Sequence, residues 1–269
     1  FTGQVKMSYL RLIRTFIEIS AQEETAHRTN FSITLLNSLL TFATGLLGLG
    51  IVYGQVDSLQ GWDYASALAV LGVFLTVSAL RGLVIGPSLD SLAGMDGEVW
   101  RGEFDFTLLR PVPTQFLVSV RRWRLFALFD LLLGLVVLGT AVSRMSTALT
   151  TTQIITFILS LIAGMFVLYA ILLTAATLVF WDPGFMITWV FDSIFQMARY
   201  PVGVYPGWLR LLLTWVVPVG VITTIPAAAL SGELDPGLLV LSMMFALLLV
   251  IGASWLFRTG LRRYHSASS

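Results

Sequence analysis

GEVWRGEFDFTLLRPVP (Gly97–Pro113) is a charge-rich segment that lies between two long apolar runs. Only 12% of the 269 residues are Asp, Glu, Lys or Arg, so such a concentration of charge is unusual in this chain. At 100° per residue, Glu98, Arg101 and Asp105 fall on one helical stripe. The segment therefore predicts a short amphipathic helix between two membrane spans.

Aromatic side chains give this predicted helix a second face. Trp100 and Phe104 lie together, away from the charged stripe, and Phe106 follows them. A loop that needs only to be soluble has no use for such a face. Pro111 ends the helix, because a proline disfavours the α conformation in the preceding residue, Arg110. A simple solvated connection between spans is the alternative, and it stays open.

The composition is that of an integral membrane protein. Hydrophobic residues make up 57% of the chain, and its 12% of charged residues is roughly half the share usual in soluble domains. No cysteine is present, and the two histidines, His27 and His265, lie near the termini, so no metal site is expected. Lys6 is the one lysine, which excludes a G-x-x-x-x-G-K-[ST] phosphate loop. We expect no catalytic residues, no cofactor and no nucleic-acid partner.

Six apolar runs each come near the ~20 residues that a helix needs to cross a bilayer. The predicted spans are Phe31–Gly54, Tyr64–Ser88, Phe116–Val142, Gln153–Phe180, Leu209–Leu230 and Leu238–Phe257. They predict an all-α integral membrane fold. Residues 1–269 are expected to form one transmembrane domain with a six-span core at 31–257.

The N-terminal segment, residues 1–30, predicts an amphipathic helix at the membrane surface. From Val5 to Gln22, polar residues share one arc and apolar residues share the other. Such a helix lies in the headgroup plane with its basic face toward anionic lipid. The alternative, the first helix of a soluble domain, is disfavoured because no soluble domain follows. Residues 1–24 lack the continuous apolar core of a signal peptide, so none is expected.

Lysine and arginine gather on one side of the predicted spans. That side holds Lys6, Arg11, Arg14, Arg28, Arg101, Arg110, Arg121, Arg122, Arg124, Arg199, Arg210, Arg258, Arg262 and Arg263. The opposite loops hold only Arg144, beside Asp57, Asp63, Glu233 and Asp235. By the positive-inside rule, both termini, the basic tail 258–269 and Gly97–Pro113 face the cytoplasm of a multi-pass protein in the cell membrane.

A second interfacial segment is predicted between the fourth and fifth spans. Asp182-Pro183-Gly184 breaks the helix, and Phe185–Arg199 then carries a narrow polar stripe among large apolar residues. That stripe consists of Thr188, Asp192, Gln196 and Arg199. The segment is too short to span, so we expect it to lie on or dip into the inner leaflet.

Two ionisable residues fall inside the predicted spans. Arg81 lies in the second span and Asp130 in the third, at similar depths. Charges at membrane depth are costly unless they are paired, so an intramembrane ion pair is expected, with a contact to a transported substrate as the alternative. A proton relay is disfavoured because no second buried carboxylate is available for it.

Two prolines interrupt the predicted fifth span. Pro218 and Pro226 each remove a backbone hydrogen bond and should kink the helix. Thr214, Thr223 and Thr224 lie nearby and could satisfy the freed carbonyl groups. Ordinary helix packing and a helix that bends to open a pathway both stay open as interpretations.

Several of these residues carry a family resemblance. The pattern Gly102-x-x-Asp105-x-x-Leu108-Leu109-Arg110-Pro111 resembles the motif in the first cytoplasmic loop of ABC-2-type exporter permeases. The Ala198-Arg199-Tyr200-Pro201 turn, Pro218, and Ile225-Pro226-Ala227 also resemble that family. The resemblance covers roughly residues 97–230.

The resemblance implies a permease domain and a role for Gly97–Pro113. In that family this loop is a coupling helix that docks on a separate ATPase subunit, which binds ATP and Mg²⁺. The residues implied here are Glu98, Trp100, Arg101, Phe104, Asp105 and Arg110. It also implies a second permease subunit, identical or homologous, and a pathway lined by the second and fifth spans. The short loop Ser231–Gly237 leaves little room for the external half-helices of larger members.

Three other functions are weighed against an exporter subunit. A secondary transporter would need a coupling-ion site and no ATPase. A membrane enzyme acting on lipid would need paired carboxylates or histidines at one depth, and the sequence offers none. An anchor subunit would hold another complex in the membrane and transport nothing.

Overall fold

The computed structural model describes residues 9–26, 28–94, 97–145, 148–182, 184 and 188–264. The helices before residue 110 are α1 (Tyr9–Ala26), α2 (Arg28–Tyr53), α3 (Tyr64–Leu80), the π-helix η1 (Arg81–Ile85), α4 (Gly86–Asp90) and α5 (Phe104–Leu108). Those that follow are α6 (Thr114–Val120), α7 (Ala127–Arg144), α8 (Thr151–Leu178), α9 (Thr188–Phe195), the 3₁₀ helices η2 (Gln196–Arg199) and η3 (Val202–Val204), α10 (Gly207–Leu211), the π-helix η4 (Leu212–Val216), α11 (Val219–Ile222), α12 (Thr224–Ser231) and α13 (Pro236–Arg263). The two short strands, β1 (Ser58–Leu59) and β2 (Trp62–Asp63), pair as an antiparallel hairpin.

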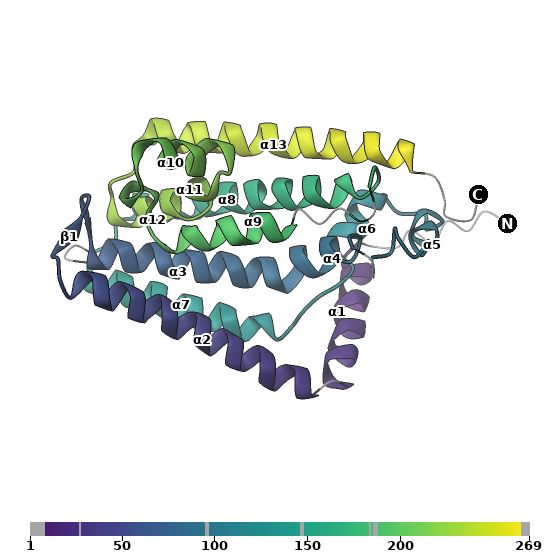
Figure 1. Ribbon diagram of the computed structural model, residues 1–269, viewed down its shortest axis with the longest axis horizontal. Coiled ribbons are helices and arrows are strands. Elements are labelled where there is room, and N and C mark those ends of the chain that lie inside the picture. Colours follow the sequence, from purple (N-terminus) through teal and green to yellow (C-terminus); the bar gives the residue numbers. More distant parts are fainter. Residues whose placement is uncertain are drawn as a thin grey trace.

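Among the residues that the structure describes, five helical segments are long and apolar enough to cross a membrane. They are Ser32–Tyr53, Tyr64–Asp90, Ala127–Arg144, Thr151–Leu178 and Pro236–Arg263. These segments run along one long direction, with the β hairpin at one end of the bundle and α5 at the other (Figure 1). We call these the hairpin end and the α5 end. The all-α membrane class is therefore confirmed.

The third predicted span begins later than expected. Residues from Phe116 to Val120 belong to the separate helix α6, and the spanning helix α7 starts only at Ala127. The basic linker between them is held by α1, since the Trp123 N–H donates to Ser20 Oγ at 3.1 Å. This helix α1 lies across the α5 end of the bundle (Figure 1), as an interfacial helix would. Residues 5–8 of that predicted helix lie outside the described part of the chain.

The chain between α8 and α10 packs along the bundle and reaches its hairpin end, so its predicted position at the inner leaflet is wrong. Phe191 and Phe195 are only 6% and 2% exposed. Further on, Gly203 lies against the indole of Trp62 in β2, which places η3 at the hairpin end. The large apolar residues outnumber the narrow polar stripe, and burying them against α3 and α8 determines the path. Residues 183 and 185–187 lie outside the described part of the chain.

The predicted fifth span, Leu209–Leu230, is also wrong, because this stretch enters and leaves at the hairpin end. It forms α10, η4, α11 and α12 rather than one helix. The far end is fixed where Gln153 Nε2, at the start of α8, donates to the Leu230 carbonyl at 3.2 Å. At its deepest point, Pro218 lines a cavity beside Ala170 in the second half of α8. Residues 207–231 therefore form a re-entrant segment.

These paths change the distribution of charge between the two ends. Arg210 donates to the Gly203 carbonyl at 2.5 Å, so it lies near the hairpin end and not beside Gly97–Pro113 as predicted. Arg199 lies inside the bundle, with its Cζ 5.4 Å from the centre of the Phe74 ring. Most other arginines counted for the positive-inside rule lie in elements at the α5 end, so the rule still favours a cytoplasmic α5 end.

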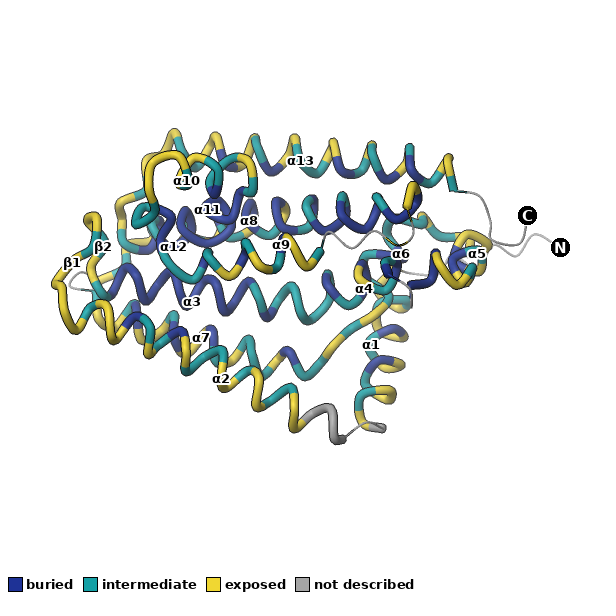
Figure 2. The backbone as a smooth tube through the Cα atoms, in the orientation of Figure 1, coloured by how far each residue is buried: buried dark blue, intermediate teal, exposed yellow. Residues whose placement is uncertain are grey.

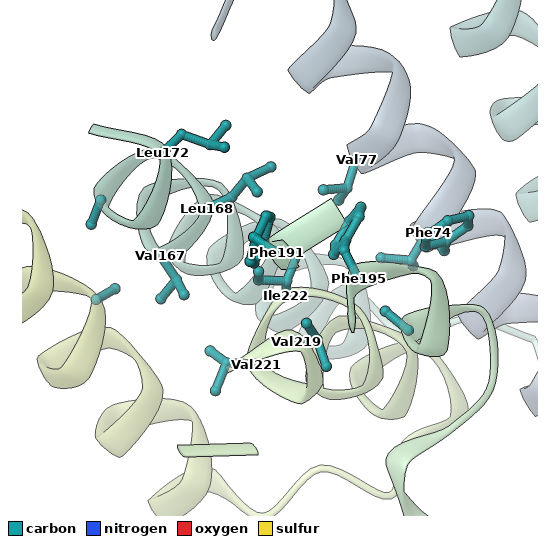
Figure 3. Packing of buried hydrophobic residues seen from close by; sticks show 14 of the residues in the cluster. Phe74, Val77, Val167, Leu168, Leu172, Phe191, Phe195, Val219, Val221 and Ile222 are labelled. Carbon is teal, nitrogen blue, oxygen red and sulfur yellow. The ribbon is translucent and has the colours of Figure 1, made fainter. Parts of the chain in front are cut away.

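The core lies where α3, α8, α9 and α11 meet. Figure 3 shows side chains from these helices converging, and the Phe74 and Phe195 rings are 5.2 Å apart. Figure 2 shows α3 buried along most of its length, whereas α2 and α13 keep many exposed residues on their outer sides. Those exposed residues include Leu36, Ile51, Leu247 and Trp255, as expected for helices that face lipid.

Replacement of Gly164 by valine should destabilise the bundle. A Cβ atom at Gly164 would lie only 3.0 Å from the Cα of Ile222, so α11 would have to move away from α8. Overpacking of this kind costs about 1–3 kcal/mol. Thermal unfolding of purified Gly164→Val should therefore show a lower midpoint. Gly252→Val is the control, because nothing lies within 4 Å of a Cβ at Gly252 in α13. Equal midpoints for the two variants would contradict this packing.

Candidate functional site

The segment 97–113 is anchored to the bundle by a buried carboxylate. Glu98 forms ion pairs with Arg121 and with Arg122, whose Nη2 lies 3.1 Å from Glu98 Oε1. Arg121 also donates to Thr107 Oγ1 at 2.9 Å and to Ser91 Oγ at 3.1 Å. Burial lowers the pKa of the Arg121 guanidinium, and the charge of Glu98 opposes that shift. The pair thus joins α5 to α4 and to the linker before α7.

An aromatic cluster forms the second anchor. Phe104 is fully buried, and its ring lies 5.3 Å from the rings of both Phe180 and Tyr264. Phe180 also contacts Phe257 of α13, with ring centres 5.7 Å apart. Burial raises the pKa of the Tyr264 phenol, and the neighbouring Asp105 raises it further, to about 12. The cluster connects α5 with the ends of α8 and α13 that lie at the α5 end of the bundle.

Two glycines allow the tight backbone path of this segment. A Cβ atom at Gly97 would lie 2.5 Å from the Leu92 carbonyl oxygen, a distance that no side chain tolerates. Gly102 has φ of +72°, in the left-handed region that glycine adopts without strain. The turn at Gly102 separates Trp100 from Phe104, and helix α5 begins only after it.

The outward side of the segment carries exposed apolar residues. Trp100 is 53% exposed, Phe106 70% and Leu109 80%, and Leu108 is also exposed. We call these four residues the outer face. The charged residues beside it, Arg101 and Glu103, form an exposed ion pair at 3.2 Å. The segment therefore presents a firmly anchored apolar surface at the α5 end.

The predicted single helix through this segment is wrong, and so are its faces. Because Gly102 turns the chain, Phe104 points into the aromatic cluster and cannot share a face with Trp100. Glu98 is buried rather than lying on a charged stripe with Arg101 and Asp105. Arg110 remains exposed. The buried role of Phe104 and Glu98 leaves Trp100 as the predicted anchor that does face outward.

Arg81 pairs with Asp192 of α9 and not with Asp130. Arg81 Nη1 lies 2.5 Å from Asp192 Oδ1, and its Cζ lies 5.9 Å from the centre of the Phe191 ring. Asp130 has no ion pair within the described part of the chain; it lines a separate cavity between α2, α3 and α7. Because the amphipathic pattern predicts Asp192 at the membrane surface, it offers no reason to pair this residue with the second span.

The two prolines act differently in the re-entrant segment. Val217 and Pro218 separate η4 from α11, so Pro218 lies at a true break in the helix. Pro226 lies in the first turn of α12, and the helix is interrupted three residues earlier at Thr223, whose φ of −122° separates α11 from α12, as a kink at this proline predicts. Thr223 donates to the carbonyl groups of Ala198 and Val219, both at 3.2 Å. As expected, a threonine satisfies carbonyl groups near the break.

Three residues of this site have a role that the sequence does not reveal. In the sequence, Arg121 and Arg122 are recognisable only as basic loop residues, although in the structure they hold Glu98 in place. In the sequence, Leu109 is recognisable only as part of the family motif, although in the structure it is the most exposed residue of the outer face. A carboxylate near several arginines signals a charge cluster, but the spacing of residues does not show which of them pair.

Loss of the Glu98 carboxylate should destabilise the fold. Glu98→Gln would leave the buried Arg121 without its counter-charge, which costs about 3–5 kcal/mol for a buried pair. The matched control is Glu103→Gln, which removes an exposed pair worth at most about 1 kcal/mol. Thermal unfolding of the purified variants should separate them clearly. If both variants unfold at the same temperature, Glu98 does not hold this segment.

The Arg81–Asp192 pair can be tested against the pair that the sequence predicts. Asp192→Asn should lower stability, because Arg81 is largely buried, whereas Asp130→Asn should leave stability nearly unchanged. The charge swap Arg81→Asp with Asp192→Arg should recover part of the loss. Unfolding midpoints measured in one detergent give the comparison. Equal effects of Asp192→Asn and Asp130→Asn would contradict the observed pairing.

Comparison with known proteins identifies the family. Residues 39–268 match the sequence model described as ABC-2 family transporter protein, which confirms the resemblance of the loop motif. No match was found among curated proteins or among solved structures. The match covers most of the bundle, the segment 97–113 and the re-entrant segment. The chain belongs to the ABC-2 family of transporter proteins.

Proposed function

We propose that this chain is the membrane-spanning permease subunit of an ATP-driven exporter, coupled to a separate ATPase subunit through the outer face. The observation that carries the proposal is the exposed apolar outer face on a segment whose opposite side is held by Glu98 and Phe104. Large aromatic side chains such as that of Trp100 are typical interface anchors. A surface held this firmly moves with the bundle, so it is suited to pass on a partner's motion.

The ATPase must be a partner subunit in this proposal. The sequence has no phosphate loop, because its one lysine is Lys6. ATP and Mg²⁺ would therefore bind to the partner. When the ATPase closes, its movement would be transmitted to α4 and to the linker before α7 through the Glu98–Arg121 pair. The same movement would be transmitted to α8 and α13 through the aromatic cluster around Phe104.

The chain would cross the cell membrane six times in this proposal. Helix α8 ends at the α5 end, whereas α13 begins at the hairpin end, so a crossing must lie between them. The path from α9 through η3 supplies it, since it leads from the inside of the bundle to Trp62. Both termini would then lie on the cytoplasmic side. The re-entrant segment would cover the external end, beside α8 and α9.

A second permease subunit, identical or homologous, would complete the pathway. Where α3, α8, α9 and α11 meet, the described core is filled by side chains (Figure 3), so no substrate path runs through that part of the bundle. A path between two bundles avoids that obstacle. The secondary transporter and the anchor subunit remain rivals, and only the exporter needs an ATPase on the outer face.

Removal of the outer face should release the ATPase. Trp100→Ser combined with Leu109→Ser removes an aromatic anchor, worth about 2 kcal/mol or roughly 30-fold in affinity, together with the most exposed aliphatic side chain of the outer face. Folding should persist, because both side chains are largely exposed. After affinity purification from native membranes, the wild type should bring down an ATP-hydrolysing subunit and the double variant should not.

Trp208→Ser is the matched control for this experiment. Trp208 is 70% exposed, but it lies in α10 of the re-entrant segment, away from the outer face. This control should keep the ATPase. A double variant that retains both the ATPase and transport would show that the segment is only a connection. A wild type that brings down no ATPase would favour the rivals.

A further inference from the structure

A polar cavity lies between α2, α3 and α7, away from the outer face. Its volume is about 280 Å³, close to the lower end of the ~300–1,000 Å³ usual for small-molecule sites. Four polar residues of α2 line it, and they recur at the spacing of one helix face. They are Thr34, Asn37, Ser38 and Thr41. Such a stripe on a membrane helix indicates a cavity with a polar occupant.

Two opposite charges lie in this cavity without forming an ion pair with each other. Arg124 and Asp130 both line it, and neither has an ion pair among the residues that the structure describes. The Oγ atom of Ser78 on α3 is buried there without a hydrogen-bond partner. Arg124 is exposed at the edge of the cavity and Asp130 is partly buried, so both charges can be reached by a ligand that enters it. The buried Ser78 hydroxyl is costly when it has no hydrogen-bond partner. The cavity is thus equipped for a ligand that supplies both charges.

Both charges are held on fixed parts of the fold. The backbone N–H of Arg124 donates to the Leu83 carbonyl at 2.9 Å, and the Arg124 guanidinium lies against Gly82 of η1. Asp130 lies in the first turn of α7, at the α5 end of that helix. Since α7 is an apolar helix just long enough to cross a bilayer, its first turn falls near the boundary between headgroups and acyl chains.

The surroundings favour a zwitterion over an anion. Thr34 and Arg124 also line a second hollow of about 760 Å³ against α1, which carries Glu23 and Glu24. Arg124 acts electrostatically on Glu24 and on Asp90 of α4, and Asp130 lines the same cavity, so several carboxylates lie around one arginine. A phosphate alone would meet Arg124 but would be repelled by the acidic groups. A ligand with a phosphate and an ammonium group would satisfy both signs.

We propose that this cavity binds the headgroup of an aminophospholipid from the leaflet at the α5 end. Arg124 takes the phosphate, and Asp130 takes the ammonium group. The polar face of α2 and Ser78 supply further hydrogen bonds. A cavity of this volume holds a headgroup but not a whole lipid, so the acyl chains stay in the bilayer beside α2. This binding does not depend on the ATPase or on transport.

Binding of short-chain lipids to the purified full chain tests the proposal. Dioctanoyl-phosphatidylethanolamine carries both charges, dioctanoyl-phosphatidylglycerol lacks the amine, and dodecylamine lacks the phosphate. Affinities are measured by titration with native mass spectrometry. We expect phosphatidylethanolamine to bind about tenfold more tightly than either of the other two, as one satisfied ion pair allows. Equal affinity for phosphatidylethanolamine and one of the others would overturn the proposal.

Charge-removing variants assign the two roles. Asp130→Asn should abolish the preference for phosphatidylethanolamine over phosphatidylglycerol, and Arg124→Gln should weaken both lipids while sparing dodecylamine. Glu233→Gln and Arg258→Gln are matched controls, because both residues are exposed and lie outside the cavity; they should keep the preference. An Asp130→Asn variant that keeps the preference would overturn the assignment.

Two further measurements separate lipid binding from misfolding and from binding of a soluble headgroup. Asn37→Leu makes α2 more apolar without touching either charge, so it should fold and yet bind phosphatidylethanolamine a few-fold more weakly. It therefore still tests the cavity if a charge variant fails to fold. Free phosphoethanolamine should compete poorly, because it has no acyl chains to bury in the micelle. If it displaces the lipid at equal concentration, the ligand is a soluble phosphoamine and the lipid assignment is wrong.

Discussion

Lipid offers membrane helices no hydrophobic reason to associate, so this bundle depends on close packing at small residues. A Cβ at Gly72 of α3 would lie 2.9 Å from the backbone of Leu138 in α7. A Cβ at Gly134 of α7 would lie 2.7 Å from the backbone of Thr76 in α3. These reciprocal contacts bring the two helices together along their length. Gly164 does the same for α8 and α11, which fixes the re-entrant segment inside the fold.

This packing explains which parts of the fold could be predicted from the sequence. Helices with about twenty apolar residues must cross the membrane whatever their neighbours are, so α2, α3, α8 and α13 could be placed by length alone. The stretches 188–204 and 209–230 could not be placed in this way. Both are short or broken, and their positions depend on contacts with α3 and α8 that no local pattern contains. The run of apolar residues around Pro218 looks the same in a span and in a re-entrant segment.

The candidate site was predictable in position but not in orientation. Family motif and charge both indicated residues 97–113, and the exposed Trp100 lies there. Gly102 was visible in the sequence, but a glycine does not by itself show a left-handed turn. Because of this turn, the residues after Gly102 face the opposite side from the one that a continuous helix predicts. Phe104 consequently packs inside, and Phe106 and Leu109 take the outward position.

The functional proposal gains its physical basis from the asymmetry between the two sides of this segment. Its inner side combines a buried ion pair with aromatic packing, and both resist displacement. Its outer side is apolar and exposed to a large extent. Motion of a partner on the outer side would therefore be carried into the bundle with little loss. The two connections reach different helices, so a tilt of the segment would move α4 and α13 together.

The re-entrant segment also has a consequence for how the protein is made. Its helices α10, α11 and α12 have five, four and eight residues, far fewer than the ~20 that a helix needs to cross a bilayer alone. They must therefore be stabilised by neighbours that are already in the membrane. Because α11 and α12 pack on α8 and α3, those helices have to be in place first. During biogenesis the re-entrant segment would therefore take its final position late, after α3 and α8 are in the membrane.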